Sequence, residues 1–289
     1  MKENSNISNI TIIGNTTWGQ AIATLINKEK AGVQILCRTE LEAKNRINKI
    51  DKLKSLPSSI QLSSDISTID NSELIILAFP SQSMRSNLNI IYNNLNQNHK
   101  FLIASKGIEK TSGKRLSEVL TEEITFIKEK NISILSGPNL AKEIYENKTT
   151  STVIASKNFS LLNNIKTVIE SDKFKIYLSD DTIGVELGGA LKNIVTLGAG
   201  ICDGLNIGNN LKGAFISIAF SEIVKLALLA GAQTVTISGL SGLGDTLASS
   251  YSPLSRNRLA GQYLAEGYSI NTINKKINKL LLSAHYISK

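Results

Sequence analysis

Apolar residues in the first 180 positions alternate between short β-branched runs and longer segments of helical periodicity. The runs have the length of buried strands, and the segments between them place apolar residues three or four positions apart. Strands that alternate with helices in this way predict a parallel, doubly wound α/β sheet. The predicted strands cover residues 10–13, 33–37, 74–79, 101–104, 132–135, 152–155 and 175–178.

The pattern changes after Asp180, beyond which the chain reads almost entirely as helix. Residues 185–201 form an apolar segment rich in glycine and alanine, and residues 214–230 form a second. Both predict helices that are buried on most of their faces. We therefore expect a Rossmann-type domain over residues 1–180 and an all-α domain over residues 181–289, a length sufficient for two cores.

Composition excludes several classes of protein. The formal charge is +8, but the lysines are scattered rather than gathered into a basic stripe, so we expect no nucleic-acid partner. Cys37 and Cys202 stand alone, which leaves no disulfide framework and no cysteine metal cluster. The polar N-terminus has no signal-peptide pattern, and no apolar run is long enough to predict a membrane span. These features favour the cytoplasm.

The first predicted turn, GNTTWG at residues 14–19, resembles a dinucleotide-binding fingerprint in which the middle glycine is Thr16. It follows a predicted strand and opens a predicted helix over 18–26, where backbone N–H groups can face a pyrophosphate. The alternative is a glycine turn that serves packing alone. Context favours the cofactor site, with affinity reduced because Thr16 has a Cβ where the pyrophosphate approaches.

Arg38 follows the second predicted strand, where NAD-binding sites carry an acidic residue for the ribose hydroxyls. A guanidinium there can accept the 2′-phosphate of NADP. A solvated surface arginine is the equally weighted alternative.

Lysine is the candidate acid/base because the only histidines, His99 and His285, lie in a polar loop and beside the C-terminus. Lys106 directly follows a predicted strand, and Lys192 falls inside the apolar segment 185–201. A lysine at such a position is costly to bury unless it faces a polar cavity, where burial lowers its pKa.

Two later segments also contain candidate polar groups: GLGD at 242–245 and SRNR at 255–258. A guanidinium beside hydroxyl and amide donors can bind a phosphate through two parallel hydrogen bonds. Ser255 alone is as well explained as the N-cap of a helix.

Taken together and in this order, the motifs resemble those of bacterial NAD(P)-dependent glycerol-3-phosphate dehydrogenase, from about Ile10 to Gly267. The matching segments are GNTTWG at 14–19, AFPSQ at 78–82, SKGIE at 105–109, LSGP at 135–138, AKE at 141–143, VELGGALKN at 185–193, GLGD at 242–245 and PLSRNR at 253–258.

The resemblance implies reversible reduction of dihydroxyacetone phosphate to sn-glycerol 3-phosphate with NADP or NAD, for glycerophospholipid synthesis, by a homodimer without a metal. It implies that Lys192 transfers the proton, with Lys106, Asp245 and Asn193 beside the reacting centre. It also implies two sets of binding residues. The implied substrate contacts are Lys106, Gly137, Asn139, Lys192, Asp245, Ser255, Arg256 and Asn257, and the implied cofactor contacts are Gly14, Thr17, Trp18, Gly19, Arg38, Lys106, Ala141 and Arg256.

The chain departs from the family at four points: Thr16 in the fingerprint, Ile218 where an arginine is usual, Leu282 near the place of a cofactor-contacting glutamate, and an end at Lys289 where relatives continue. Two other functions stay open. One is a related reductase of another small hydroxy acid, against which the phosphate-binding segment 255–257 argues. The other is a degenerate nucleotide-binding protein without activity, against which Lys106, Lys192 and Asp245 argue.

Overall fold

The computed structural model describes residues 7–51 and 55–277. The chain divides into two compact units. The first, here the α/β unit, comprises the residues up to Ser105 together with 116–135 and 141–180. The second, here the helical unit, comprises 106–115, 136–140 and the residues from Asp181 onward.

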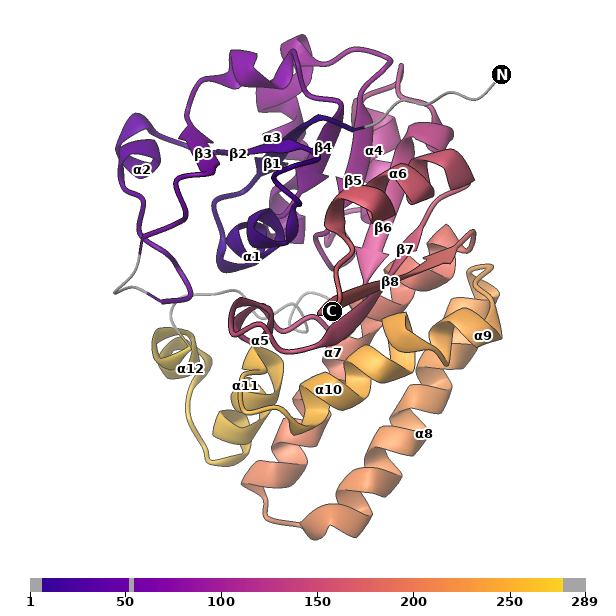
Figure 1. Cartoon of the computed structure of the whole chain (residues 1–289). Coiled ribbons are helices and arrows are strands. Elements are labelled where there is room, and N and C mark those ends of the chain that lie inside the picture. The colour runs from indigo at the N-terminus through magenta and orange to yellow at the C-terminus, as the bar shows by residue number, and fades with distance from the viewer. Residues whose placement is uncertain (1–6, 52–54, 278–289) are drawn as a thin grey trace. The chain divides into compact units, whose positions relative to one another are not determined.

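The described residues form one eight-stranded sheet in the order β3-β2-β1-β4-β5-β6-β7-β8 (Figure 1). The pairings β2–β3, β1–β2, β1–β4, β4–β5, β5–β6 and β7–β8 are parallel. The strands are β1 (Asn9–Ile13), β2 (Gly32–Leu36), β3 (Ile60–Ser63), β4 (Leu74–Leu77), β5 (Lys100–Ile103), β6 (Ile132–Ser136), β7 (Thr150–Ala155) and β8 (Phe174–Ser179).

The seven predicted strands are confirmed, and β3 was missed. The reason lies in burial: β4 is buried at all four residues, whereas β3 buries only Ile60. The β3 sequence IQLS does alternate between apolar and polar residues, but the alternation spans only residues 60–63, the shortest run that predicts a strand, and there is no continuous apolar run.

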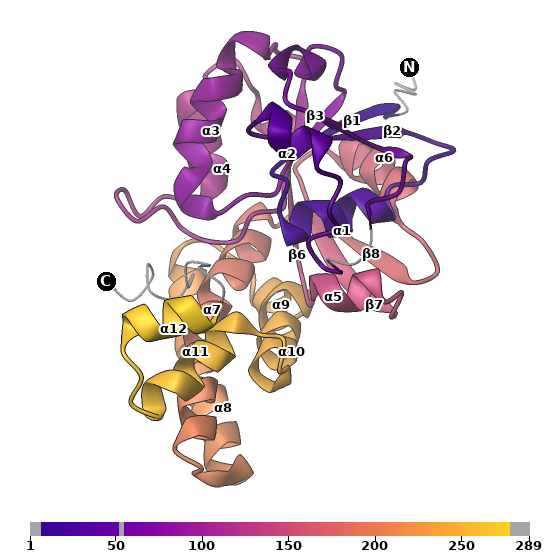
Figure 2. The ribbon, with the colours of Figure 1, turned by 90° about the vertical axis from the view of Figure 1, so that its left-hand side faces the viewer.

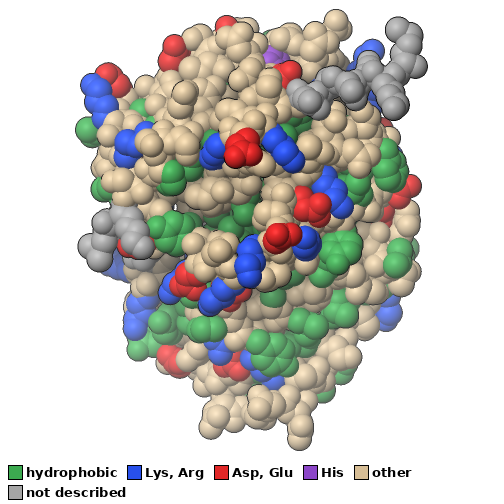
Figure 3. Space-filling model, in the orientation of Figure 1, with side chains coloured by type: hydrophobic (Ala, Val, Ile, Leu, Met, Phe, Trp, Pro, Cys, Tyr) green, Lys and Arg blue, Asp and Glu red, His purple; other side chains and the backbone are tan. Residues whose placement is uncertain are grey.

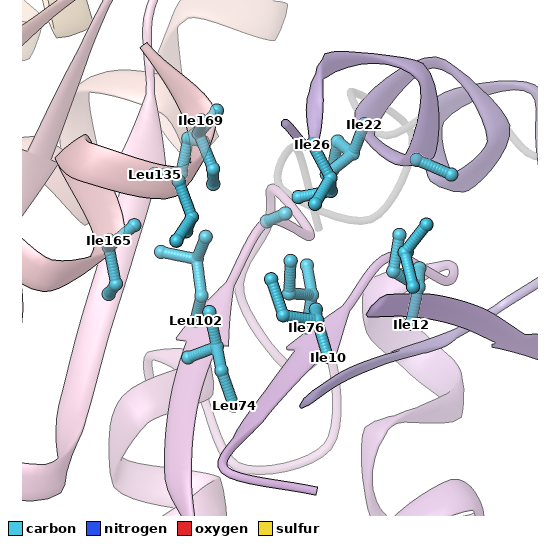
Figure 4. Close-up of a cluster of buried hydrophobic side chains, with 14 of the residues drawn as sticks. Ile10, Ile12, Ile22, Ile26, Leu74, Ile76, Leu102, Leu135, Ile165 and Ile169 are labelled. Atoms are coloured by element: carbon cyan, nitrogen blue, oxygen red, sulfur yellow. The ribbon is translucent and has the colours of Figure 1, made fainter. Parts of the chain in front are cut away.

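Helices cover both faces of the sheet, as Figure 2 shows for α3 and α4 on one side and α1 and α6 on the other. Ile22 and Ile165, from α1 and α6, belong to one core with the strand residues Ile12, Ile76 and Leu102 (Figure 4). Full burial of each such side chain contributes about 1.5–3 kcal/mol to the stability of the fold.

The helices of the α/β unit are α1 (Thr17–Leu25), α2 (Glu40–Lys44), α3 (Met84–Ile91), α4 (Leu116–Glu123), α5 (Ala141–Tyr145) and α6 (Phe159–Ile169). Single 3₁₀ turns lie at Ile66–Ile69, Ser81–Ser83, Tyr92–Asn94 and Glu129–Asn131.

Beyond Asp181 every described element is helical, which confirms the predicted all-α region. The elements are α7 (Thr182–Gly204), α8 (Gly208–Leu229), α9 (Thr234–Ile237), the π-helical turn Leu240–Gly244, α10 (Asp245–Tyr251), α11 (Arg256–Ala265) and α12 (Ile270–Lys276). Charged and apolar side chains are interspersed on the face shown in Figure 3.

The two long helices differ in burial. The prediction of a helix buried on most faces is confirmed for α7, which buries 15 of its 23 residues, but it is wrong for α8. Only one stripe of α8 is buried, while Ile218 and Leu229 are 67% and 88% exposed. Both faces of α8 are apolar in sequence, so periodicity could not separate the packed face from the exposed one.

By length and composition alone, α7 could cross a membrane, a possibility that the sequence analysis did not anticipate. Its most apolar window is 72% buried within the protein. A long apolar helix is also what the core of a globular unit requires.

The two units are not separated by a single boundary. Residues 106–115 come after β5, and residues 136–140 begin at the last residue of β6. Both segments group with the helical unit. The predicted boundary at residue 180 placed both segments with the sheet, because adjacency in sequence does not reveal which core a loop contacts.

Candidate active site

The turn between β1 and α1 requires glycine at both ends of the fingerprint. Gly14 has a φ of +115°, and a Cβ there would lie 2.6 Å from the carbonyl oxygen of Ala78. A Cβ on Gly19 would overlap the carbonyl oxygen of Gly14. Packing alone therefore explains both glycines, and their role in cofactor binding stays a prediction.

Thr16 acts as the N-cap of α1. Its Oγ1 accepts a hydrogen bond from Gly19 N (3.0 Å) and donates one to Ala78 O (2.8 Å). Such a cap contributes about 1 kcal/mol. The hydroxyl thus gives a structural reason for threonine in place of glycine, while it engages one N–H that a bound anion would otherwise reach.

Trp18 and Ala141 are half-buried against the core of the α/β unit, and Thr17 is the half-buried first residue of α1. The indole Nε1 of Trp18 donates to Ala104 O at 2.9 Å, which ties α1 to the end of β5. These contacts fix the start of α1 relative to the carboxyl ends of the central strands, where doubly wound sheets bind ligands.

Arg38 is exposed two residues beyond β2, and a carboxylate stands beside it. The Oε2 atom of Glu42 accepts a hydrogen bond from Arg38 N (3.1 Å), and Oε1 accepts one from Lys49 Nζ (3.0 Å). Burial raises the pKa of Glu42, but these partners outweigh it and hold that pKa below its usual value. Sequence reasoning missed Glu42 and Lys49.

In the helical unit, Asp245 brings Lys106 and Lys192 together. Lys106 Nζ donates to Asp245 Oδ2 at 2.7 Å and to Gly137 O at 2.8 Å. Lys192 Nζ donates to the other carboxylate oxygen, Oδ1, at 2.8 Å. Lys192 and Asp245 are buried, at 9% and 3% exposure. The ion pair explains how an apolar helix carries a lysine.

Burial lowers the pKa of Lys192, against the opposing effect of Asp245, and the charge of Lys106 lowers it further. Burial raises the pKa of Asp245, but Lys106 and Lys192 outweigh that effect and hold the pKa below its usual range. Asp245 is therefore ionised at neutral pH, and Lys192 releases its proton more readily than an exposed lysine does.

Ser249 completes this cluster and was missed by sequence reasoning. Lys192 Nζ donates to its Oγ at 2.5 Å, and Oγ also contacts Asp245 Oδ1 at 3.2 Å. Ser249 lies four residues after Asp245 on α10, and side chains with that spacing share one helix face. The spacing was the available signal, although it required knowing that 245–251 is a helix.

Local packing positions these groups. Gly189 on α7 leaves room for Ser136 and for the Lys106 side chain, because a Cβ there would overlap Ser136 Oγ. The π-helical turn ends where α10 begins, so Asp245 is the first residue of that helix. Such turns occur often at functional sites.

The segment 255–257 forms the start of α11. Ser255 is the N-cap, accepting from Arg258 N at 3.4 Å, which confirms the capping interpretation without excluding a further role. Asn257 Nδ2 donates to the buried Asn193 Oδ1 at 2.7 Å and so ties α11 to α7. Arg256 is exposed and has no hydrogen-bond or ion-pair partner among the described residues.

Asn139 is half-buried in the loop after β6. It comes two residues after Gly137, which has a φ of +155°.

His99 is buried, accepts a hydrogen bond from Asn96 N at Nδ1 and contacts Ile69 O through Nε2. No cluster of three metal-ligating side chains occurs within residues 7–51 and 55–277. Leu282 and His285 lie outside the described residues.

The structure thus brings Lys106, Lys192 and Asp245 together, and it pairs Asn193 with Asn257. A buried ammonium held by a carboxylate can exchange a proton with an oxygen that gains or loses charge. The chemistry that these residues support is proton transfer to or from a small polar substrate.

Comparison with known proteins supplies the family. A family model described as NAD-dependent glycerol-3-phosphate dehydrogenase N-terminus matches residues 9–162, and the C-terminus model matches residues 181–288. Glycerol-3-phosphate dehydrogenase [NAD(P)+] of Dehalococcoides mccartyi is 39% identical over 92% of this chain and 76% of its own length. The enzyme of the same name from Fusobacterium nucleatum is 35% identical over 94% of this chain and 83% of its own length.

A crystal structure of glycerol-3-phosphate dehydrogenase from Coxiella burnetii has a TM-score of 0.90 at 26% identity, covering 97% of this chain and 86% of its own. A Plasmodium falciparum glycerol-3-phosphate dehydrogenase shares the fold, with a TM-score of 0.86 at 24% identity and coverage of 98% and 85%. Two matching domain models and relatives aligned over most of their length establish the assignment: the chain belongs to the NAD(P)-dependent glycerol-3-phosphate dehydrogenase family of oxidoreductases.

Proposed function

We propose that this chain catalyses the reversible reduction of dihydroxyacetone phosphate to sn-glycerol 3-phosphate with NADPH or NADH. The observation that supports this most is the pair of lysines on one carboxylate, the buried Lys192 and the half-buried Lys106 on Asp245. Family membership supplies the substrate and cofactor class, and the pair supplies a proton donor suited to a carbonyl that becomes an alcohol.

In the proposed reaction, Lys192 donates its proton to the C2 oxygen as negative charge develops there, and it takes the proton back in the oxidation direction. The nicotinamide, when bound, supplies the hydride. Asp245 stays ionised throughout and holds the Lys106 ammonium and the Lys192 amino group, whether or not Lys192 carries the transferred proton. Lys106 and Asn193 orient the substrate oxygen. Ser249, together with Asp245, holds the Lys192 amino group in position through a hydrogen bond.

We further propose that Arg256, with Ser255 and Asn257, binds the substrate phosphate, and that Gly137 and Asn139 line the substrate loop. The α/β unit would then bind the cofactor, and the helical unit, which includes residues 106–115 and 136–140, would bind the substrate. The substrate phosphate is remote from C2, and its binding energy would orient the C2 carbonyl for the reaction. The proposed cofactor contacts are Gly14, Thr17, Trp18, Gly19, Arg38, Lys106, Ala141 and Arg256.

The residues present fit a dinucleotide. The turn at 14–19 presents backbone at the carboxyl end of β1, and Gly14 and Gly19 keep that backbone bare of side chains. The test is a panel assay of NADPH oxidation with the purified chain. We expect turnover with dihydroxyacetone phosphate and little with ketopantoate or with short β-ketoacids. The opposite ranking would favour the related-reductase alternative, and no turnover with any substrate would favour a protein without activity.

Arg38→Ala should raise the KM for NADPH about three- to ten-fold and leave the KM for NADH nearly unchanged, because only the 2′-phosphate loses a charge-assisted contact. Steady-state kinetics with both cofactors measures this. Equal losses with both would indicate stacking on the adenine instead. Unchanged values would leave Arg38 as a solvated surface residue.

We also propose a homodimer that uses the exposed face of α8. Leu211, Ile218 and Leu229 are 56%, 67% and 88% exposed, and their spacing of seven and eleven residues keeps them on one helix face. Glu222 and Lys225 lie on the same face and form an ion pair of 2.7 Å. A two-fold axis midway between them would place Glu222 beside Lys225 of the partner subunit and Ile218 beside Leu229 of the partner subunit, a self-complementary pattern.

The double variant Ile218→Glu, Leu229→Glu should be a monomer in analytical ultracentrifugation at concentrations where the unaltered chain is a dimer. Val235→Glu is the matched control, because Val235 is similarly exposed, at 75%, but lies on α9 and not on α8. A monomeric unaltered chain, or a dimer that survives the double variant, would refute the α8 interface.

The cellular setting is the last proposal. We propose a cytoplasmic enzyme whose product supplies glycerophospholipid synthesis. Two isolated, buried free cysteines, Cys37 and Cys202, fit a reducing compartment.

A further inference from the structure

The exposed end of β2 carries two cations around a single carboxylate. Arg38 follows the strand, Glu42 lies one helical turn later on α2, and Lys49 approaches from the loop that follows. The carboxylate of Glu42 contacts both neighbours, through Arg38 N at 3.1 Å and Lys49 Nζ at 3.0 Å. The charge of Arg38 adds a smaller lowering effect on the pKa of Glu42.

This arrangement is anchored at both ends. The backbone N–H of Lys49 donates to Gln20 Oε1 at 2.7 Å, and Gln20 is 1% exposed on α1, the helix that follows the fingerprint turn. Gln20 Nε2 in turn donates to Asn15 Oδ1, within that turn, at 2.8 Å. Thr39 Oγ1 accepts from Glu42 N at 3.1 Å and so fixes the start of α2. Lys49 is therefore positioned by the same residues that shape the proposed cofactor turn.

Because the carboxyl end of β2 is where doubly wound sheets receive the adenosine ribose, these three side chains meet the group that distinguishes NADP from NAD. A 2′-phosphate is attracted by the two cations and repelled by Glu42, whereas a 2′-hydroxyl can donate a hydrogen bond to Glu42.

We propose that Lys49, together with Arg38, forms the receptor for the 2′-phosphate, and that Glu42 is the residue that sets the preference between NADH and NADPH. The proposal rests on the proposed dehydrogenase function and extends it. Glu42 holds Lys49 while the ribose is unphosphorylated and releases it to a 2′-phosphate, so that one chain accepts both cofactors.

A neighbouring ion pair provides a matched control. Glu40 and Lys44 lie on the same short helix, 2.6 Å apart and mostly exposed. Neither hydrogen-bonds to Arg38 or Lys49 among the described residues. Lys44→Met therefore removes the same charge from the same region and leaves the cluster around Glu42 in place.

The experiment is isothermal titration calorimetry with adenosine 2′,5′-bisphosphate and 5′-AMP, which carry the ribose with and without the 2′-phosphate. Lys49→Met should weaken binding of the bisphosphate about three- to ten-fold and leave 5′-AMP within about two-fold. Glu42→Gln should do the reverse, with tighter binding of the bisphosphate by a similar factor and weaker binding of 5′-AMP. Lys44→Met should leave the ratio of the two dissociation constants unchanged.

A failed cofactor site and a failed assignment of Lys49 and Glu42 give different results. If the unaltered chain binds neither nucleotide, the cofactor site fails and this proposal with it. If it binds both, and Lys49→Met and Glu42→Gln leave the ratio unmoved or change it as much as Lys44→Met does, only the roles of Lys49 and Glu42 are refuted. All three substitutions lie on partly or fully exposed side chains, and thermal unfolding verifies that each variant is folded.

Discussion

Lys192→Ala should lower kcat by about two to four orders of magnitude, with NADPH binding largely intact, because the reaction loses its proton donor and acceptor. Steady-state kinetics with dihydroxyacetone phosphate and calorimetric binding of NADPH measure the two effects separately. Near-normal turnover in a folded variant would remove Lys192 from the mechanism.

Lys212→Met is the control for loss of a buried lysine as such. Lys212 is 4% exposed, pairs with Asp203 at 2.8 Å, and has its ammonium over the Tyr251 ring rather than on the Asp245 carboxylate. We expect this variant to lose stability while its kcat stays close to that of the unaltered chain. An equal fall in kcat in both variants would indicate a structural cause.

The pH dependence follows from the lowered pKa of Lys192. Carbonyl reduction needs the protonated amine, so its kcat should fall as pH rises through that pKa, and alcohol oxidation should gain rate over the same range. The charge of Asp245 raises the pKa of Lys192. Removing that charge in Asp245→Asn should therefore shift the pH profiles of both reduction and oxidation to lower pH.

Arg256→Ala should raise the KM for dihydroxyacetone phosphate about ten- to hundred-fold, because one charge-assisted contact to a phosphate contributes about 1.5–3 kcal/mol. The KM for the cofactor is measured in parallel, since Arg256 is also a proposed cofactor contact. Arg258→Ala is the matched control, because Arg258 lies two residues on and pairs with Asp203. An unchanged KM for the substrate in Arg256→Ala would refute the phosphate assignment.

The strands and the fold class were predictable because parallel strands buried on both faces leave continuous apolar runs, as at residues 74–77. Lys192 was predictable for the converse reason, since a charge within a buried apolar helix requires a partner. Periodicity could not predict that α8 exposes Ile218, because large apolar residues occur on the exposed face of that helix as well as on the buried one. At β3 the apolar/polar alternation covers only residues 60–63, too short a run to be recognised as a strand without its pairing to β2.

The remaining site residues depend on tertiary contacts. Ser249 can be recognised as a site residue only once α10 is known to place it beside Asp245. Glu42 can be recognised only once the hydrogen bond from Lys49 N to Gln20 is known to place Lys49 beside it. Thr16 shows that a residue that departs from a sequence motif can have a structural role that the motif does not predict. Its sequence position suggested a weakened cofactor site, whereas its hydroxyl makes a cap and a tether that the fingerprint pattern does not encode.

Isotope labelling follows the hydride into the product and so tests the proposed reaction itself. The purified chain is incubated with dihydroxyacetone phosphate and NADPH deuterated at the hydride position, and the product is analysed by mass spectrometry and NMR. We expect the unaltered chain to form sn-glycerol 3-phosphate with deuterium at C2, and Lys192→Ala to form it far more slowly. No labelled sn-glycerol 3-phosphate from the unaltered chain, or equal rates from both, would contradict the proposed reaction.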